Sequence, residues 1–137
     1  MPGRRRILIA EDDGLVRELI RSKLTAAGYD AHTARCGREA IERMVIVKPQ
    51  ALLLDLNLPD VDGFAVLEAV RENPVAAAVP VMVLTVSRAP ADVQRAVSLG
   101  ARDYLTKDRL GGQLLPRLAR MLRPPVETGA EGASEAA

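Results

Sequence analysis

The sequence contains very few of the residues that form disulfides and zinc sites. Its 137 residues include one Cys, one His and no Trp. A lone cysteine cannot form an internal disulfide, and a single histidine has no second histidine with which to share a metal ion. We therefore interpret Cys36 as a small residue in a loop or at a helix start, and His32 as an exposed strand residue.

The sequence also lacks long hydrophobic runs and a large net charge. No apolar stretch is long enough to span a membrane. Arg4-Arg5-Arg6 and the short run Ile7 to Ala10 superficially resemble a signal peptide, but the run is too short and leads directly into acids. A hydrophobic content of 48% and a formal charge of +1 are typical of one soluble domain. We expect a cytoplasmic protein with no membrane association, and a solvated arm at Arg4-Arg6 rather than a nucleic-acid contact.

What the sequence does contain is a regular alternation of strand and helix patterns. Short apolar runs bounded by Pro or Gly predict strands buried on both faces, and the amphipathic segment 29–33 predicts an edge strand. Residues at helical spacing lie between these runs. The pattern predicts an α/β fold with a doubly wound, five-stranded parallel sheet, whose strands cover residues 7–10, 29–33, 51–54, 79–84 and 103–106.

Helix boundaries follow from Pro and Gly. Gly28 is placed to stop a first helix that carries Leu15, Val16, Leu19, Ile20 and Leu24, and Lys48-Pro49 and Asn73-Pro74 end the second and third helices. Pro90 opens the fourth helix and Gly100 stops it. In the fifth helix, Pro116 is tolerable only in the first turn. From Pro124 the pattern fails, which predicts one domain over residues 1–123 and a disordered acidic tail over residues 124–137.

Polar residues of complementary type end four of the predicted strands. Asp55 ends the run at 51–54, the acids Glu11 to Asp13 follow the first run, and Thr85 and Lys107 follow the last two. An isolated Asp after an apolar run is more often a turn or cap residue. Because the carboxyl ends of parallel strands share one edge of a sheet, these four strand ends together predict a single site.

The chemistry of this site predicts a divalent metal and a nucleophile. Converging carboxylates raise one another's pKa, and Mg²⁺, which prefers carboxylate, water and phosphate oxygens, relieves this repulsion. A carboxylate can carry a phosphoryl group if the phosphoryl oxygens are neutralised as they arrive. We expect Asp55 to be the nucleophile, Lys107 to pair with one phosphoryl oxygen, and the Thr85 hydroxyl to donate to another.

These residues occur in the order and spacing of a known family. The acid pair Glu11-Asp12, Asp55 within the segment 53–63, and Thr85, Tyr104 and Lys107 all match, over about residues 5–123. The chain therefore resembles a receiver domain of the CheY-like response regulators of two-component signal transduction. The resemblance implies a flavodoxin-like (βα)5 fold with strand order 2-1-3-4-5.

The resemblance also implies roles for single residues. Asp55 would accept a phosphoryl group from a histidine kinase or a histidine phosphotransfer protein, and Thr85 and Lys107 would bind the phosphoryl oxygens. Mg²⁺ would be held by Asp12, by Glu11 through water, by Asp55, and by the backbone carbonyl of Asn57.

Several acids near the site admit a second interpretation. The acidic pair can also be aligned as Asp12-Asp13, but counting from the strand favours Glu11-Asp12 and leaves Asp13 to begin the first helix. Asp60 and Asp62 are interpreted as turn and cap residues, with Gly63 at the start of the third helix.

Two residues depart from the common family pattern. Val86 stands where a small residue usually follows the threonine, and it should crowd the approach to the phosphoryl group. Asp108 stands where proline usually follows the lysine. A cis bond before a non-proline residue costs about 2.5 to 4 kcal/mol, so we expect a trans peptide after Lys107.

The output is expected to be a protein surface. No residues suited to a DNA-binding or enzymatic output domain follow the tail, so we expect a stand-alone receiver with no DNA-binding domain. The resemblance implies that a downstream protein binds the face built from the fourth helix, fifth strand and fifth helix, with Thr85 and Tyr104 as switch residues. The sequence leaves open whether phosphorylation promotes dimerisation. We expect no enzymatic activity beyond self-catalysed phosphotransfer and autodephosphorylation.

Two functions from other classes fit these residues less well. A Mg²⁺-dependent phosphatase with an aspartate nucleophile generally has a second Asp two residues later, and Asn57 at that position cannot transfer protons. A phosphorylation-independent interaction module with the receiver fold would not need Asp12, Asp55, Thr85 and Lys107 together.

Overall fold

The computed structural model describes residues 3–123, and the predicted acidic tail at 124–137 lies outside them. Five parallel strands form one sheet in the order β2-β1-β3-β4-β5. The predicted fold class and strand order are therefore confirmed. The strands are β1 (Arg6–Ala10), β2 (Asp30–Ala34), β3 (Ala51–Asp55), β4 (Val81–Thr85) and β5 (Asp103–Thr106).

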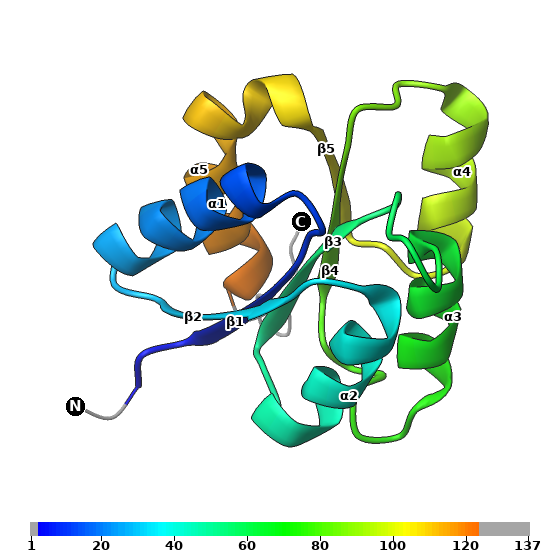
Figure 1. Ribbon diagram of the computed structural model, residues 1–137, viewed down its shortest axis with the longest axis horizontal. Coiled ribbons are helices and arrows are strands. Elements are labelled where there is room, and N and C mark those ends of the chain that lie inside the picture. The colour runs from blue at the N-terminus through cyan, green and yellow to red at the C-terminus, as the bar shows by residue number, and fades with distance from the viewer. Residues whose placement is uncertain (1–2, 124–137) are drawn as a thin grey trace, which may run out of the picture.

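Five α-helices cover the two faces of this sheet (Figure 1). In Figure 1, α1 and α5 lie on one face, and α2, α3 and α4 lie on the other. A 3-10 turn, η1 (Lys107–Arg109), connects β5 to α5. The helices are α1 (Gly14–Ala26), α2 (Gly37–Val47), α3 (Gly63–Glu72), α4 (Pro90–Ser98) and α5 (Leu110–Leu122).

Two of the three inner strands, β3 and β4, are entirely buried and apolar up to their last residues because both of their faces are covered. All five residues of β3 are buried, as are all five of β4. Successive side chains point to opposite faces, so Leu54 packs in the core under α2, α3 and α4, and Leu53 packs in the core under α1 and α5. Each fully buried leucine contributes about 1.5 to 3 kcal/mol to the free energy of unfolding. The buried strands therefore form a rigid support for the polar residues at their carboxyl ends.

Helix starts follow the sequence closely. Asp13 caps α1, where its carboxylate accepts hydrogen bonds from the amides of Leu15 (2.9 Å) and Val16 (3.2 Å). Asp62 caps α3 by accepting from the amide of Ala65 at 2.9 Å. The cap roles predicted for Asp13 and Asp62 are therefore confirmed, and Cys36 lies at the start of α2 as expected.

One helix prediction is wrong, at Pro116, and the apolar stripe of α1 is only partly buried. Leu15 and Leu19 belong to the apolar stripe of α1, yet they are 85% and 51% exposed. Within α1, only Ile20 and Leu24 are completely buried. Pro116 lies in the second turn of α5, because the helix begins at Leu110, directly after η1.

The basic N-terminal segment is not simply a solvated arm. Arg6 lies in β1, and its guanidinium donates to the carbonyls of Val47 (3.0 Å) and Lys48 (2.9 Å) at the end of α2. Arg5 donates to the carbonyl of Leu122, at the end of α5, at 2.7 Å. Cations at helix carboxyl ends offset the negative end of the helix dipole. Both arginines therefore tie the start of the sheet to helix ends.

Among residues 3–123, no helix is both long enough and apolar enough to cross a membrane. The His32 ring lies 3.1 Å from the carboxylate of Asp30 on β2, the edge strand of the sheet.

Candidate acidic site at the carboxyl edge of the sheet

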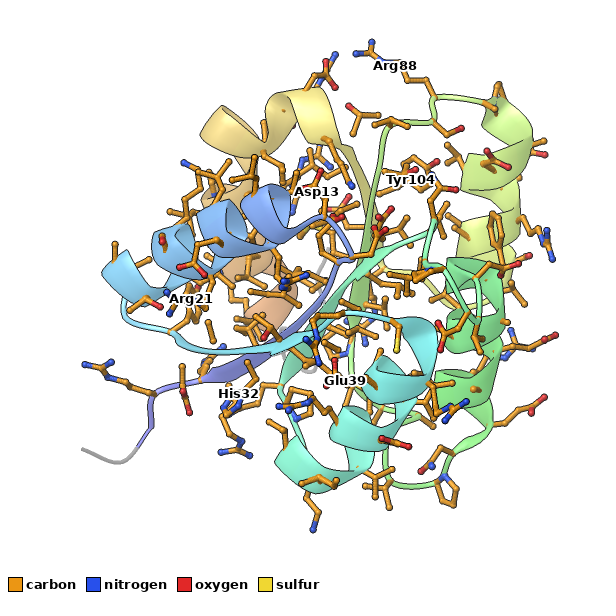
Figure 2. All side chains as sticks on the ribbon, viewed as in Figure 1. Asp13, Arg21, His32, Glu39, Arg88 and Tyr104 are labelled. Carbon is orange, nitrogen blue, oxygen red and sulfur yellow. The ribbon has the colours of Figure 1, made fainter. Side chains whose placement is uncertain are left out.

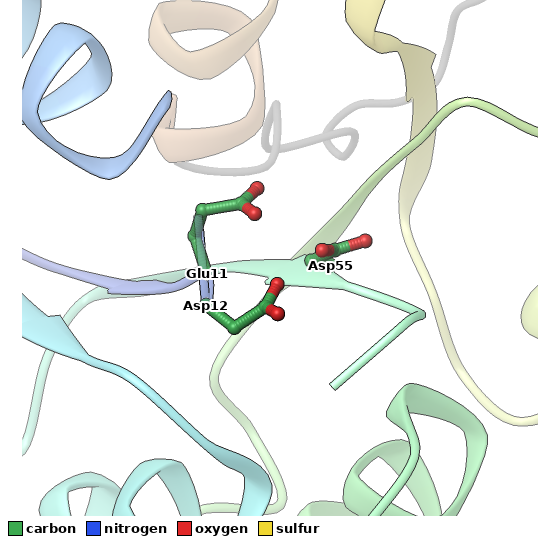
Figure 3. Close-up of side chains that lie close together, drawn as sticks. All are labelled: Glu11, Asp12 and Asp55. Atoms are coloured by element: carbon green, nitrogen blue, oxygen red, sulfur yellow. The ribbon is translucent and has the colours of Figure 1, made fainter. Parts of the chain in front are cut away.

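Three carboxylates meet where β1 and β3 end (Figure 3). Glu11, Asp12 and Asp55 each place one carboxylate oxygen within 4.8 Å of the others. Glu11 and Asp55 are 1% and 2% exposed, whereas Asp12 is open to solvent. The amide of Glu11 donates to the carbonyl of Ala34 at 3.0 Å, so the pairing of β1 with β2 continues into the acidic loop. The sheet thus positions the predicted carboxylates together.

Lys107 supplies the cation beside two of these carboxylates. Its ammonium nitrogen lies 2.8 Å from Glu11 Oε1 and 3.2 Å from Asp55 Oδ2. The contact with Glu11 is an ion pair rather than a well-directed hydrogen bond, because Oε1 has no partner at hydrogen-bond geometry among the described residues. Lys107 follows β5, so its side chain reaches past the end of β4 to contact both acids.

The protonation of the site follows from burial and pairing. Burial raises the pKa of Glu11, and its interaction with the ammonium group of Lys107 opposes this effect. Burial by itself would lower the pKa of Lys107, but its interactions with Glu11 and Asp55 outweigh burial and leave that pKa raised. Lys107 therefore stays a cation at neutral pH.

The three carboxylates fit a divalent metal such as Mg²⁺. One lysine cannot neutralise three carboxylates within 4.8 Å of one another, so the cluster keeps an excess of negative charge. Carboxylate oxygens are the ligands that Mg²⁺ prefers, and the open side of Asp12 leaves space for water or phosphate oxygens. The predicted ligands at residues 11, 12 and 55 are thus brought together.

Asn57 and Thr85 lie next to the acceptor. The amide of Asn57 donates to Asp55 Oδ1 at 3.1 Å, which holds the loop after β3 against the carboxylate. Thr85 ends β4, adjacent to Asp55, and is completely buried. Its hydroxyl oxygen accepts from the amide of Ser87 at 3.3 Å, so its hydrogen remains able to donate elsewhere.

Tyr104 connects β5 to the loop that follows Thr85. Its ring packs against the core under α2, α3 and α4, and Figure 2 shows it on the side of the sheet that faces α4. Its hydroxyl donates to the carbonyl of Ser87 at 3.1 Å. Burial raises the pKa of Tyr104, and hydrogen bonds with Ser87 and Thr85 partly oppose this rise. The two predicted switch residues, Thr85 and Tyr104, are therefore connected through Ser87, to which both are hydrogen-bonded.

The loop after Asp55 is bound to the start of α2, which the sequence did not reveal. Asp60 accepts hydrogen bonds from the amides of Gly37 (2.7 Å) and Arg38 (3.0 Å). These backbone donors hold the pKa of Asp60 well below its usual range. Gly37 is needed for this contact, because an added Cβ would lie 2.3 Å from the carbonyl oxygen of Val61. Asp60 is thus a cap residue as predicted, but it caps a helix that precedes it by more than twenty residues.

Ser87, Arg88 and Asp108 form a second set of contacts that sequence analysis missed. Ser87 Oγ donates to Asp92 Oδ2 at 2.7 Å, near the start of α4. Arg88 pairs with Asp108, the residue after Lys107. No local pattern predicts the pairing of Arg88 with Asp108, because it joins the β4-α4 loop to the segment after β5. No cis peptide occurs in the described residues, in agreement with the trans bond expected after Lys107.

A doubly wound parallel sheet with a buried aspartate, one acid pair and a lysine at its carboxyl edge defines a receiver-type α/β protein. A model of the response regulator receiver domain family matches residues 7–119. The chain belongs to this family. The resemblance inferred from the sequence is therefore confirmed.

Curated relatives and solved structures agree with this assignment. The chain is 37% identical, over 118 residues, to the DNA-binding dual master transcriptional regulator RpaA of Synechocystis, and 36% identical to the transcriptional regulatory protein TrcR of Mycobacterium tuberculosis. These matches cover 86% of this chain but only 49% and 45% of the relatives. The chain thus spans about half the length of the curated relatives it matches.

Among solved structures, the chain resembles a response regulator from Chloroflexus aurantiacus, with a TM-score of 0.83 and 31% identity. That match covers 88% of this chain and 98% of the other. The chemotaxis protein CheY4 of Vibrio cholerae also gives a TM-score of 0.83, at 28% identity, with coverage of 87% and 99%. Both neighbours support the receiver fold across the described residues.

Proposed function

We propose that this protein is the phosphoacceptor of a two-component phosphorelay, with Asp55 as the acceptor. The observation that carries the proposal is the placement of Asp55: its carboxylate is buried, it ends a fully buried strand, and the ammonium group of Lys107 lies 3.2 Å away. The phosphoryl donor is a histidine kinase or a histidine phosphotransfer protein, as the family implies. Beyond self-catalysed transfer and autodephosphorylation, we propose no enzymatic activity.

The chain's own residues orient the reacting groups and neutralise the negative charge of the phosphoryl oxygens during the transfer. An oxygen of Asp55 attacks the phosphorus atom while the bond to the donor imidazole breaks, and the leaving imidazole keeps its electron pair and takes a proton. Lys107 shifts its contact from Asp55 to an arriving phosphoryl oxygen, and the Thr85 hydroxyl donates to another. Glu11, Asp12, Asp55 and the carbonyl of Asn57 would hold Mg²⁺. When bound, Mg²⁺ supplies further neutralisation of the phosphoryl oxygens.

The proposed output is a change in the surface formed by α4, β5 and α5. Tyr104 already bonds to Ser87 in the loop that leads from Thr85 into α4. If the Thr85 hydroxyl moves toward a phosphoryl oxygen, the loop and the Tyr104 ring can adopt a second arrangement, which a downstream protein would recognise. The matched regulators are longer proteins, so a stand-alone receiver without a DNA-binding domain stays a prediction.

Phosphorylation by a small-molecule donor tests the proposal. Acetyl phosphate with Mg²⁺ should add one phosphoryl group, detected by intact mass, in an acyl linkage that hydroxylamine cleaves. Asp55→Asn should abolish this addition, whereas Asp62→Asn, which changes a helix cap away from the site, should retain it. Equal incorporation into the Asp55→Asn protein would contradict the assignment.

A further inference from the structure

A basic hollow lies beside β5 and the end of α5, at the opposite edge of the sheet from Asp55. One cavity of about 240 Å³ is lined by Arg102, Asp103, Arg117, Arg120, Met121 and Arg123. A neighbouring cavity of about 330 Å³ shares residues 102, 121 and 123 and adds Arg5, Gln50, Pro80 and Leu122. We name these two cavities together the arginine hollow. Its lining contains five arginines and a single acid.

The position of the hollow separates it from the acidic site. Arg5, Pro80 and Arg102 each stand just before a strand, at the amino ends of β1, β4 and β5. Parallel strands of five residues span about 15 Å, and the acidic site lies at their carboxyl ends. A small ligand in the arginine hollow therefore contacts none of the carboxylates at residues 11, 12 and 55.

The single acid cannot neutralise the hollow. Asp103 Oδ1 lies 2.7 Å from Arg117, and its other oxygen lies 3.7 Å from Arg120. Arg5 is engaged with the carbonyl of Leu122. Within residues 3–123, the side chains of Arg102 and Arg123 form no hydrogen bond or ion pair, although both line both cavities. Among the described residues, these two guanidinium groups thus stay free for a ligand.

Part of the hollow is already held in place. Arg117 donates to Asp103 and also to Gln113 Oε1, at 2.9 Å, and Arg5 is fixed by the end of α5. A single exposed arginine is ordinarily only solvated. Here five arginines line one concave surface, so an anion with several acceptor oxygens would relieve their mutual repulsion. The planar guanidinium group matches phosphate with two parallel hydrogen bonds, which favours phosphate over simple halides.

We propose that the arginine hollow binds an anion that carries a di- or triphosphate group. Arg102 and Arg123 hold the phosphate oxygens, and the arginines already held in place add to the positive potential. Nucleotides and inorganic pyrophosphate share this chemistry. Met121 lines both cavities and offers an apolar contact that only a nucleotide would use. This site is independent of phosphorylation at Asp55.

Titration of the full chain with ADP, in EDTA to remove divalent metal, tests the proposal by amide chemical shifts. We expect shifts at residues 102–103 and 117–123 and none at residues 53–58. The double variant Arg102→Gln, Arg123→Gln should lower the affinity at least tenfold. The matched control Arg35→Gln, Arg43→Gln removes two arginines that contact Glu39 on α2, and should leave the affinity unchanged.

Two further ligands and one further variant identify the source of the phosphate. Pyrophosphate should bind and adenosine should not. If Met121→Ala binds ADP more weakly than the parent protein does but binds pyrophosphate equally well, the site is assigned to nucleotides. If Met121→Ala binds both ligands as tightly as the parent protein does, the site is assigned to the diphosphate group alone. Adenosine binding as tightly as ADP, absence of shifts around the hollow, or undiminished affinity in the double arginine variant would each overturn the proposal.

Discussion

The carboxylate of Asp60 accepts hydrogen bonds from the backbone amides of Gly37 at 2.7 Å and Arg38 at 3.0 Å. Asp60 lies five residues after the proposed acceptor, and Gly37 begins α2, which covers the same face of the sheet as α3. The contact therefore fixes the loop that carries Asn57 to a neighbouring helix. Asp60 therefore stabilises the acidic site although it would not itself touch the phosphoryl group.

Substitution of Gly37 should show how tightly this loop is packed. The added Cβ of Gly37→Ala would meet the backbone oxygen of Val61 at 2.3 Å, so the loop or the helix must shift. We expect the free energy of unfolding to fall by about 1 to 3 kcal/mol. Gly111→Ala in α5 is the matched control, because its Cβ meets nothing within 4 Å, and it should stabilise by up to about 1 kcal/mol. Urea unfolding followed by far-UV circular dichroism measures both, and equal effects would refute the close packing.

The low pKa of Asp60 predicts a pH-dependent contribution to stability. A carboxyl whose folded pKa is depressed stabilises fully above its unfolded pKa of about 3.9, and this stabilisation is lost as the pH falls toward the folded pKa. Asp60→Ala should therefore lower the thermal midpoint more at pH 7 than at pH 3. Glu42→Gln, an exposed change on α2, should lower it at neither pH. A deficit in Asp60→Ala that is independent of pH would contradict the ionic role of the cap.

Metal binding should depend on Asp12 far more than on Asp60. Asp12 offers a carboxylate oxygen to the cluster, whereas Asp60 acts only through the loop. We expect Asp12→Ala to weaken Mg²⁺ binding at least tenfold, or about 1.4 kcal/mol, and Asp60→Ala to weaken it much less. Isothermal calorimetry measures both constants. Equal losses would mean that the acidic loop is assigned incorrectly.

Val86 should control the lifetime of the phosphorylated protein. It follows Thr85 directly and is 70% exposed, so its branched side chain stands on the surface beside the site. Val86→Ala should admit water more easily and lower the barrier to hydrolysis by about 1 kcal/mol, which is several-fold in rate. The decay of the acyl phosphate, followed by intact mass, gives this rate. An unchanged or longer lifetime would remove the steric explanation.

Thr85 should couple phosphorylation to the output surface. Its hydroxyl lies in a hydrogen-bonded group with Tyr104 and Ser87, so removing it should leave the chemistry but uncouple the response. We expect Thr85→Ala to be phosphorylated on Asp55, with smaller amide shift changes across residues 90–110 than the parent protein. Changes of undiminished size there would show that the signal bypasses Thr85.

The sequence by itself determined the fold class and the edge at which the site lies. Buried parallel strands need continuous apolar runs, and β3 and β4 are such runs, so their ends at Asp55 and Thr85 were visible without coordinates. The caps at Asp13 and Asp62 were also predictable, because the side chain of an N-cap residue binds backbone amides that lie only two or three residues away in the sequence.

Only the tertiary structure decided the contacts between segments that are distant in the chain. The docking of Asp60 on Gly37, the pairing of Arg88 with Asp108 and the arginine hollow each depend on how helices pack on the sheet. Helical spacing also placed Leu15 and Leu19 among the apolar residues of α1, but the period alone does not show which of these residues are buried. Local sequence patterns indicate helices, strands and caps, whereas these contacts depend on which surfaces meet when the helices pack on the sheet.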